Sequence, residues 1–301
     1  MSESGEHKIR WDKAFIYTDD LIFPSENQIR YWDGKADTYI TEGSHCPDFL
    51  EIIDHTLPDI LTIKDQFHKS RGTYDKNALA QRDIARNLLS LLSEWNPANR
   101  SNILEIGSGT GILTSLYMSG LNPGKVTLVD LVHSENTRAC DQMEYIEADA
   151  ETWISMTQNK WDIVLSSSTI QWFSDLKRFI INCQRVLNPG GILAISGFTQ
   201  GNLSEFDHIR NNPLAYPTKK EVVTILSGLF KEFKVTDEEM KVTFPTKRDA
   251  LLHLKKTGVS TTHTRSGDAA IGLKSISDCI PSDEQGNVFL TYRPLYILAR
   301  K

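Results

Sequence analysis

The sequence predicts an α/β fold, in which a mostly parallel sheet carries helices on both faces and a small αβ extension precedes it. Two observations support this prediction. Short runs rich in β-branched residues alternate with helical stretches through most of the chain, which is typical of parallel sheets covered by helices. The first of these runs leads into a glycine-rich turn and a helix, as the first strand of a nucleotide-binding sheet does.

The elements of the main domain follow from hydrophobic periodicity. A helix is expected within residues 74–95, where apolar residues recur at helical spacing. Loop-like segments are expected at residues 200–217 and 260–280. Strands are expected at residues 103–106, 126–129, 145–147, 163–166 and 192–196.

Residues 1–62 are predicted to form a separate N-terminal extension, and residues 63–301 the main domain. In the extension, the patterns predict strands at residues 13–17 and 36–41 and helices at residues 25–32 and 47–57. No internal repeat or low-complexity segment is present.

Composition narrows the class of protein. The apolar runs of the 301-residue chain are far shorter than the roughly 20 residues of a membrane span, and residues 1–10 do not resemble a secretory signal. A cytoplasmic location is therefore expected. The net charge of −6 argues against a general nucleic-acid binder. Reduced thiols and no metal site are expected, because the cysteines lie apart without a CxxC motif: Cys46, Cys140, Cys183 and Cys279.

The strongest chemical signal is the segment NILEIGSGTGILT, residues 102–114. A strand ends near Glu105 and runs into Gly107, Gly109 and Gly111, where the backbone can approach a ligand closely. The dinucleotide fingerprint requires Gly or Ala at its sixth position, and counting from either of the first two glycines gives neither. A nicotinamide or flavin cofactor is therefore disfavoured.

This acid-x-Gly-x-Gly-x-Gly pattern resembles the first motif of class I S-adenosylmethionine-dependent methyltransferases, whose fold is Rossmann-like. Asp130 ends the second strand, 19 residues after Gly111, where a carboxylate can accept both ribose hydroxyls. The resemblance implies that Asp149 bonds the adenine amino group and that the backbone N–H of Ala150 reaches the ring. The alternative role is helix capping or a turn for Asp130 and helix capping for Asp149. S-adenosylmethionine is the expected cofactor.

Four further segments resemble, in order and spacing, the malonyl-acyl-carrier-protein O-methyltransferases of biotin synthesis. The similarity covers roughly residues 67–301 and implies methyl transfer to the free carboxylate of a malonyl thioester. Ser167 stands where relatives usually carry Asn, which is expected to alter how the methionine part of the cofactor is held. The segments are SRGTYDKNALAQ, STIQWFSDLKRFIINCQRVLNPGGILAIS, FPTKRDALLHLKKTGVS and LTYRPLYILARK.

A carboxylate acceptor needs no general base, because carboxylic acids with a pKa of about 4 are ionised at neutral pH. The catalytic residues are therefore expected to be positioning residues: Tyr74 from the entry helix, and Gln171 and Trp172 after the fourth strand. Gln81 is expected to position ligands from the entry helix and, with Ser167, to contact the cofactor. For the aromatic residues the alternative is packing in the core, and for Gln81 it is a solvated helix face.

The resemblance implies an acyl carrier protein, which is acidic, as the partner that carries malonyl. A locally basic surface is therefore expected despite the net negative charge. Arg265 and Arg293 are candidate cations for the malonyl carboxylate, although a surface role is the alternative for each. The basic residues expected near the active site are Lys219, Lys220, Lys241, Lys247, Arg248, Lys255 and Lys256.

The segment WDKAFIYTDDLIFPSENQIRYW near the N-terminus resembles the end of the pimeloyl-carrier-protein methyl ester esterases. Asp20 and His45 stand where α/β-hydrolases carry the triad acid and histidine, yet only Ser2 and Ser4 precede them. The extension is thus predicted to be a hydrolase remnant without esterase activity, and an unrelated helical extension is the alternative. For the whole chain, the alternatives are a methyltransferase of a small free carboxylic acid and a catalytically silent binding protein.

Overall fold

The structure, a computed structural model, describes residues 29–32, 39–41, 64, 77–132, 141–207, 216–257 and 277–301. The chain divides into two compact units, Met1–Leu57 and Pro58–Lys301. Each unit is described by itself.

In the first unit, β1 (Ile29–Trp32) pairs antiparallel with β2 (Tyr39–Thr41). The predicted helix at residues 25–32 is therefore wrong for its last turn, and the predicted strand is confirmed for Tyr39–Thr41. Aromatic residues such as Tyr31 and Trp32 are common in strands. The backbone of these residues pairs with β2, a second segment of the chain, and local periodicity does not reveal such a pairing. Asp20, His45 and the other predicted elements of this unit lie outside the described residues.

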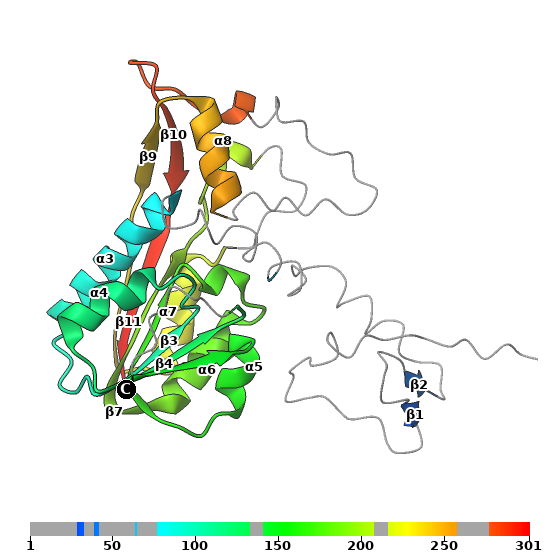
Figure 1. The fold of residues 1–301 in the computed structure, drawn as a ribbon, viewed down its shortest axis with the longest axis vertical. Coiled ribbons are helices and arrows are strands. Elements are labelled where there is room, and N and C mark those ends of the chain that lie inside the picture. Colours follow the sequence, from blue (N-terminus) through cyan, green and yellow to red (C-terminus); the bar gives the residue numbers. More distant parts are fainter. Residues whose placement is uncertain are drawn as a thin grey trace, which may run out of the picture. The chain divides into compact units, whose positions relative to one another are not determined.

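The second unit is built on a seven-stranded sheet (Figure 1). Its first five strands are parallel, and β11 pairs antiparallel with both β7 and β8. All five predicted strands are confirmed, and with them the predicted α/β fold. In spatial order the strands are β5 (Met143–Glu147), β4 (Lys125–Asp130), β3 (Asn102–Ile106), β6 (Trp161–Ser167), β7 (Leu187–Phe198), β11 (Pro294–Arg300) and β8 (Glu232–Asp237).

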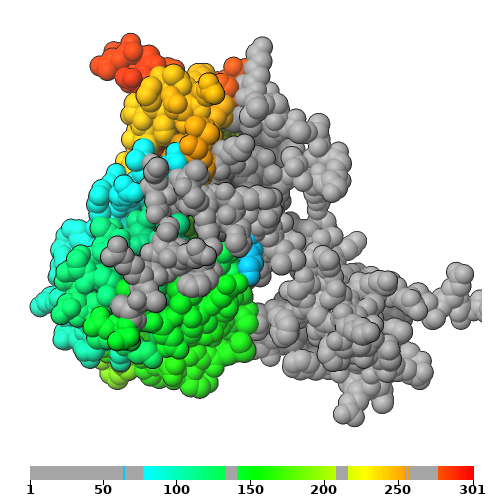
Figure 2. Space-filling model, in the orientation of Figure 1, coloured from blue at the N-terminus to red at the C-terminus, as the bar shows by residue number. Residues whose placement is uncertain are grey.

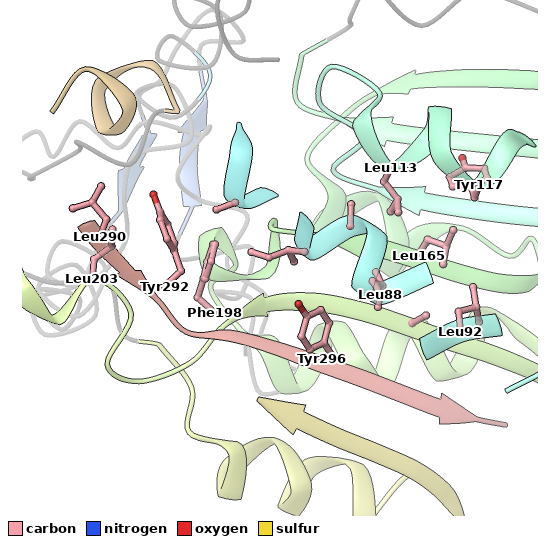
Figure 3. Close-up of a cluster of buried hydrophobic side chains, with 14 of the residues drawn as sticks. Leu88, Leu92, Leu113, Tyr117, Leu165, Phe198, Leu203, Leu290, Tyr292 and Tyr296 are labelled. Atoms are coloured by element: carbon pink, nitrogen blue, oxygen red, sulfur yellow. The ribbon is translucent and has the colours of Figure 1, made fainter. Parts of the chain in front are cut away.

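Helices cover both faces of this sheet, because successive side chains of each strand point to opposite faces. Ile103 packs with α3 (Leu79–Glu94) and α4 (Ile112–Leu121), whereas Leu104 packs on the opposite face. Figure 3 shows Leu88 and Leu92 of α3 near Leu165 of the sheet, with Leu113 and Tyr117 of α4 close by. The second face carries α5 (Ala150–Met156), α6 (Leu176–Val186) and α7 (Lys219–Ser227).

Beyond the sheet, β9 (Met240–Phe244) pairs antiparallel with β10 (Val288–Tyr292), and α8 (Lys247–Lys256) packs on this pair. We call these three elements the C-terminal cap; Figure 2 shows its orange residues gathered above the cyan and green residues of the sheet layers. Buried residues of the cap belong to the same apolar core as α3 and the sheet, and Figure 3 shows Leu203, Leu290 and Tyr292 beside Phe198. Two short 3-10 helices complete the unit, η1 (Ile170–Trp172) and η2 (Ser204–Phe206).

Among the described residues, no helix combines the length and the apolar character needed to cross a membrane. The same part of the chain holds no group of His, Cys, Asp or Glu that would bind a metal ion. Cys183 is a buried free thiol, and Cys279 is half-buried. Burial raises the pKa of the Cys183 thiol well above its usual value, so this cysteine is an inert part of the core.

Candidate cofactor site

A pocket of about 150 Å³ lies where β3, β4 and β6 end and α5 begins. Parallel strands present their carboxyl ends at one edge, which is where open α/β sheets bind ligands. Gly111 and Gln171 do not line this pocket, and Tyr74 lies outside the described residues. The predicted residues that do line it are Gln81, Glu105, Gly107, Gly109, Asp130, Asp149, Ala150, Ser167 and Trp172.

The glycine turn has the backbone geometry that the sequence predicts. Gly107 has φ 71°, and a Cβ atom there would clash with the side chain of Thr169. Gly109 has φ 52°, and a Cβ atom there would meet no atom within 4 Å, so a ligand has room to approach its backbone. Gly111 is the N-cap residue of α4, and its N–H donates to the carbonyl of Ser108 at 2.9 Å.

Glu105 is a buried carboxylic acid below the turn, with only 1% of its surface exposed. Its Oε2 accepts hydrogen bonds from the hydroxyls of Thr114 and Tyr117, each at 2.7 Å. Burial raises the pKa of Glu105 to about 7, and the charge of Asp130 adds to this rise, while the two hydrogen bonds oppose it. A positive group bound in the pocket would favour the ionised form of Glu105.

Asp130 at the end of β4 holds the turn in place. Its Oδ2 accepts a hydrogen bond from the N–H of Gly109 at 2.8 Å, and its Oδ1 accepts one from the N–H of Val132 at 3.0 Å. A carboxylate has about four lone-pair sites, so one such group can both hold the turn and accept hydrogen bonds from other groups.

Asp149 is the N-cap residue of α5. Its Oδ2 accepts from the backbone N–H of Thr152 at 3.1 Å and from the hydroxyl of the same residue. The capping role that the sequence left open is thus present in the structure. Both bonds fall on one oxygen, which leaves Oδ1 for a ligand, and Ala150 continues the pocket wall.

Glu151 also lines the pocket, although the sequence motifs do not predict it. Its carboxylate accepts hydrogen bonds from the N–H groups of Ser174 and Asp175 at 2.8 and 3.0 Å, and so ties the start of α5 to the start of α6. Burial raises its pKa, against the effect of these bonds. The sequence signal that could have predicted its place in the pocket is its position directly after Asp149 and Ala150. The other lining residues that were missed are Ala85, Ser108, Thr110, Ile112, Leu113, Leu131, Val132, Ser168, Thr169 and Phe173.

Two polar atoms of lining residues are buried without a hydrogen-bond partner, Oε1 of Gln81 and Oγ of Ser168. Gln81 is 6% exposed, so it is not the solvated helix residue that was the alternative. Buried polar groups in native proteins nearly always have partners. A polar ligand is therefore expected at both atoms.

The loop after β6 carries the remaining predicted residues. Ser167 accepts a hydrogen bond from the hydroxyl of Ser196 at 2.9 Å, while Trp172 forms part of the wall. Gln171 does not line the pocket, and its Nε2 donates to the carbonyl of Ser168 at 2.7 Å. Its Oε1 is buried without a hydrogen-bond partner among the described residues, and its direct contact with a ligand stays a prediction.

The described lining is acidic. Four carboxylic acids face the pocket, Glu105, Asp130, Asp149 and Glu151, and none of the described lining residues is Lys, Arg or His. Arg293, a predicted cation for the malonyl carboxylate, instead pairs with Glu239 at 2.8 Å and does not line the pocket. Arg265 lies outside the described residues.

The predicted basic residues are partly neutralised within the chain. Lys219 pairs with Asp237 at 2.9 Å, Lys241 approaches Glu239 at 3.8 Å, and Lys247 donates to a backbone carbonyl. The side chain of Lys255 lies outside the described residues, and Lys256 is half-buried. The exposed members of the set are Lys219, Lys220, Lys241 and Arg248.

Comparison with known proteins identifies the family. A family described as a methyltransferase domain matches residues 104–195. The malonyl-[acyl-carrier protein] O-methyltransferase of Haemophilus influenzae is 32% identical over 254 residues, which cover 81% of this chain and 96% of that protein. This chain belongs to the malonyl-[acyl-carrier protein] O-methyltransferase family. The predicted family and enzyme class, an S-adenosylmethionine-dependent O-methyltransferase, are thereby confirmed.

A second relative is longer than this chain. The malonyl-[acyl-carrier protein] O-methyltransferase of Bacteroides fragilis is 30% identical over 306 residues, covering 97% of this chain but 61% of that protein. The match therefore extends into residues 1–62. Among solved structures, the YcgJ protein of Bacillus subtilis has the same fold, with a TM-score of 0.50 and 15% identity over 72% of this chain and 98% of that chain.

Proposed function

We propose that this methyltransferase transfers a methyl group from S-adenosylmethionine to the free carboxylate of malonyl-acyl-carrier protein, the entry step of pimeloyl synthesis for biotin. The observation that carries the proposal is an acidic pocket built on the glycine turn, in a chain whose relatives are named for this reaction. A cytoplasmic location is part of the proposal.

The residues present fit the cofactor. Asp130 would accept the ribose hydroxyls, while Oδ1 of Asp149 and the N–H of Ala150 would bind adenine. The open space beside Gly109 would allow the cofactor to pass close to the backbone of the glycine turn. Oε1 of Gln81 lacks a partner and suits the positive ammonium group of the methionine end. The acidic lining favours a cation, since opposite charges attract strongly where water is largely excluded.

When bound, the cofactor supplies a methyl group on a positively charged sulfur. The malonyl carboxylate is ionised at neutral pH, so the chain need not remove a proton from it. Its residues instead orient the carboxylate and exclude water, an effect that supplies on the order of 7 to 11 kcal/mol. The aromatic side chains of Trp172 and Phe173 line the pocket and would exclude water from it. Gln171 would act indirectly, through its hydrogen bond to the carbonyl of Ser168. Tyr74 remains a proposed positioning residue.

The carrier protein would dock on the exposed basic residues near the pocket edge. Lys220 begins α7, and Arg248 lies in the first turn of α8. Residues 1–62 are proposed to be a hydrolase remnant. The match to the longer Bacteroides fragilis relative extends into this region and is compatible with that reading.

The test is methyl transfer from labelled cofactor, with malonyl-carrier protein, malonyl-coenzyme A and free diacids offered side by side. Preferred labelling of malonyl-carrier protein supports the proposal. Preferred labelling of a free diacid would replace it with a small-acid methyltransferase. Absence of cofactor binding by calorimetry would establish a silent binding protein, and the Asp130→Ala variant provides the background rate.

A further inference from the structure

Ser168 has an unusual backbone for a serine and lies in the pocket wall. Its φ is 55°, in the left-handed region that non-glycine residues seldom adopt. The conformation is held by its N–H, which donates to the carbonyl of Ser196 at 2.9 Å, and by Gln171, whose Nε2 donates to the carbonyl of Ser168 at 2.7 Å. Strained residues that their surroundings fix in this way gather at functional sites.

The strand order places Ser168 on the acceptor side of the pocket. In the sheet, β6 lies beyond β3, on the side opposite to β4 and β5. Under the proposed function, adenine lies by the end of β5, the ribose by the end of β4 and the glycine turn at the end of β3. The methionine end and its methyl group then face the loop after β6, from which the acceptor must approach.

The chemistry of the wall narrows the choice of donor. An acceptor carboxylate needs a donor, yet none of the described lining residues is a cationic side chain. The Oγ of Ser167 is engaged as the acceptor of the hydroxyl of Ser196, and the hydroxyl of Thr169 donates to the carbonyl of Ser167 at 3.1 Å. The hydroxyl of Ser168, by contrast, is buried and has no hydrogen-bond partner among the described residues.

We propose that the hydroxyl of Ser168 donates a hydrogen bond to the carboxylate that receives the methyl group, which makes Ser168 a substrate-binding residue. This inference rests on the proposed function. Ser168 lines the pocket, and a hydrogen bond from its hydroxyl to a carboxylate would be charge-assisted. One carboxylate oxygen is held by Ser168. The other uses a lone pair to form the new bond to the methyl carbon, while the electron pair of the breaking carbon–sulfur bond stays on sulfur.

Two substitutions separate the hydroxyl from the backbone conformation. Ser168→Ala and Ser168→Gly both remove the hydroxyl, but only glycine relieves the left-handed strain. Both are expected to raise KM for malonyl-carrier protein by roughly 10- to 100-fold, the range for a hydrogen bond to a charged group. The Kd for S-adenosylmethionine, measured by calorimetry, should change by less than about twofold, because the cofactor keeps all its proposed contacts.

Two further variants complete the design. Ser168→Asn keeps a side-chain donor and tolerates the left-handed region, so it is expected to recover part of the loss in KM. The matched control is Asn122→Ala. Asn122 is exposed at the end of α4, has φ 48°, and does not line the pocket. This control adds the same kind of backbone strain and should leave KM unchanged.

An unchanged KM in a folded Ser168→Gly variant would overturn the inference. Loss in Ser168→Ala with full activity in Ser168→Gly would also overturn it, since the role would then be conformational. A raised Kd for the cofactor with an unchanged KM would assign the hydroxyl to the cofactor instead. If the wild-type protein binds no cofactor or methylates no carboxylate, the proposed function itself fails, and this result is distinct from the other three.

Discussion

The pocket edge of the sheet and the C-terminal cap each bury an ionisable side chain beside a tyrosine, with opposite results. In the sheet region, Glu105 bonds Tyr117 and its pKa rises to about 7. In the cap, the ring Nε2 of His253 lies 2.8 Å from the hydroxyl of Tyr292, and its pKa falls to about 4. Burial is the main cause in both places. It disfavours the charged form, which is the ionised acid in one case and the protonated base in the other.

The two regions also differ in how they depend on a ligand. Glu105 lies in the pocket wall, where a bound cation would offset the cost of its charge. His253 lies between Phe244 and Tyr292 in the cap and does not line the pocket. The buried acid is thus placed to respond to a ligand, whereas the buried histidine contributes to packing.

The largest effect is expected from core truncation, which tests whether the two regions unfold together. Leu88 of α3 and Leu290 of the cap are both fully buried in one continuous core. Leu88→Ala and Leu290→Ala should each lower the free energy of unfolding by about 2 to 5 kcal/mol. Urea denaturation followed by fluorescence should show a single transition in both variants. A separate early transition confined to Leu290→Ala would mean that the cap is an independent unit.

The next effect is the pH dependence of the sheet region. The native pKa of Glu105, about 7, lies above the ordinary value of 4.5. Protonation of Glu105 therefore stabilises the folded state fully below pH 4.5. This contribution to the free energy of unfolding decreases between pH 4.5 and 7 and is absent above pH 7. Its loss amounts to about 3 kcal/mol. In urea denaturation without cofactor, the free energy of unfolding of the wild-type protein minus that of Glu105→Gln should fall by this amount between pH 4.5 and 7, a difference in which the contribution of His253 cancels. The same slope in the variant would refute the assignment to Glu105.

In the C-terminal cap, the contribution of His253 to stability should depend on pH in the opposite direction. The native pKa of His253, about 4, lies below the ordinary 6.5. The unfolded chain therefore binds the proton more tightly, and stability falls as the pH drops from 6.5 to 4, by up to about 3 kcal/mol. In the wild-type protein the opposite slope of Glu105 cancels this fall between pH 4.5 and 6.5, so the fall is measured in the Glu105→Gln background, where adding His253→Gln should flatten it. If the Glu105→Gln protein shows no fall in stability between pH 6.5 and 4, the assignment to His253 is refuted.

The sequence predicted the sheet region better than the cap, for physical reasons. Strand runs and the turn after Glu105 are local, so periodicity and glycine spacing were sufficient. Pairing of β9 with β10 joins Phe244 to Val288, and no local pattern specifies such a distant partner. The same holds for Ile29–Trp32, whose strand depends on β2. Ser168 escaped notice because nothing in its residue type signals a left-handed backbone.

A smaller effect is expected at the proposed cofactor contacts. Asp130→Ala should weaken S-adenosylmethionine binding by roughly 1 to 3 kcal/mol, the scale of charge-assisted hydrogen bonds to a ligand. Asp149→Ala should cost less, because the backbone N–H of Ala150 is retained. Calorimetry on folded variants measures both. Equal affinity in Asp130→Ala and the wild-type protein would remove the ribose assignment.

The smallest effect is expected at the surface and concerns the carrier protein. Lys220 and Arg248 are exposed, and each is the second residue of its helix, α7 and α8 respectively. β8 runs parallel to β7, because β11 is antiparallel to both, so β8 ends at the same edge of the sheet as β7. Asp237 is the last residue of β8, and Lys219 pairs with it. Lys220, the next residue, therefore lies toward the edge of the sheet that carries the pocket. Lys231 precedes β8 at the opposite edge and is also exposed, which makes it the matched control.

Reversing Lys220 and Arg248 to glutamate should raise KM for malonyl-carrier protein roughly threefold, since exposed charge pairs contribute up to about 1 kcal/mol. The increase should shrink as salt is added, because exposed charges are screened over about 10 Å at 0.1 M. Malonyl-coenzyme A should show little change, and Lys231→Glu should leave both substrates unaffected. Equal losses on both thioesters would mean that these residues shape the pocket, and the carrier protein would then dock elsewhere.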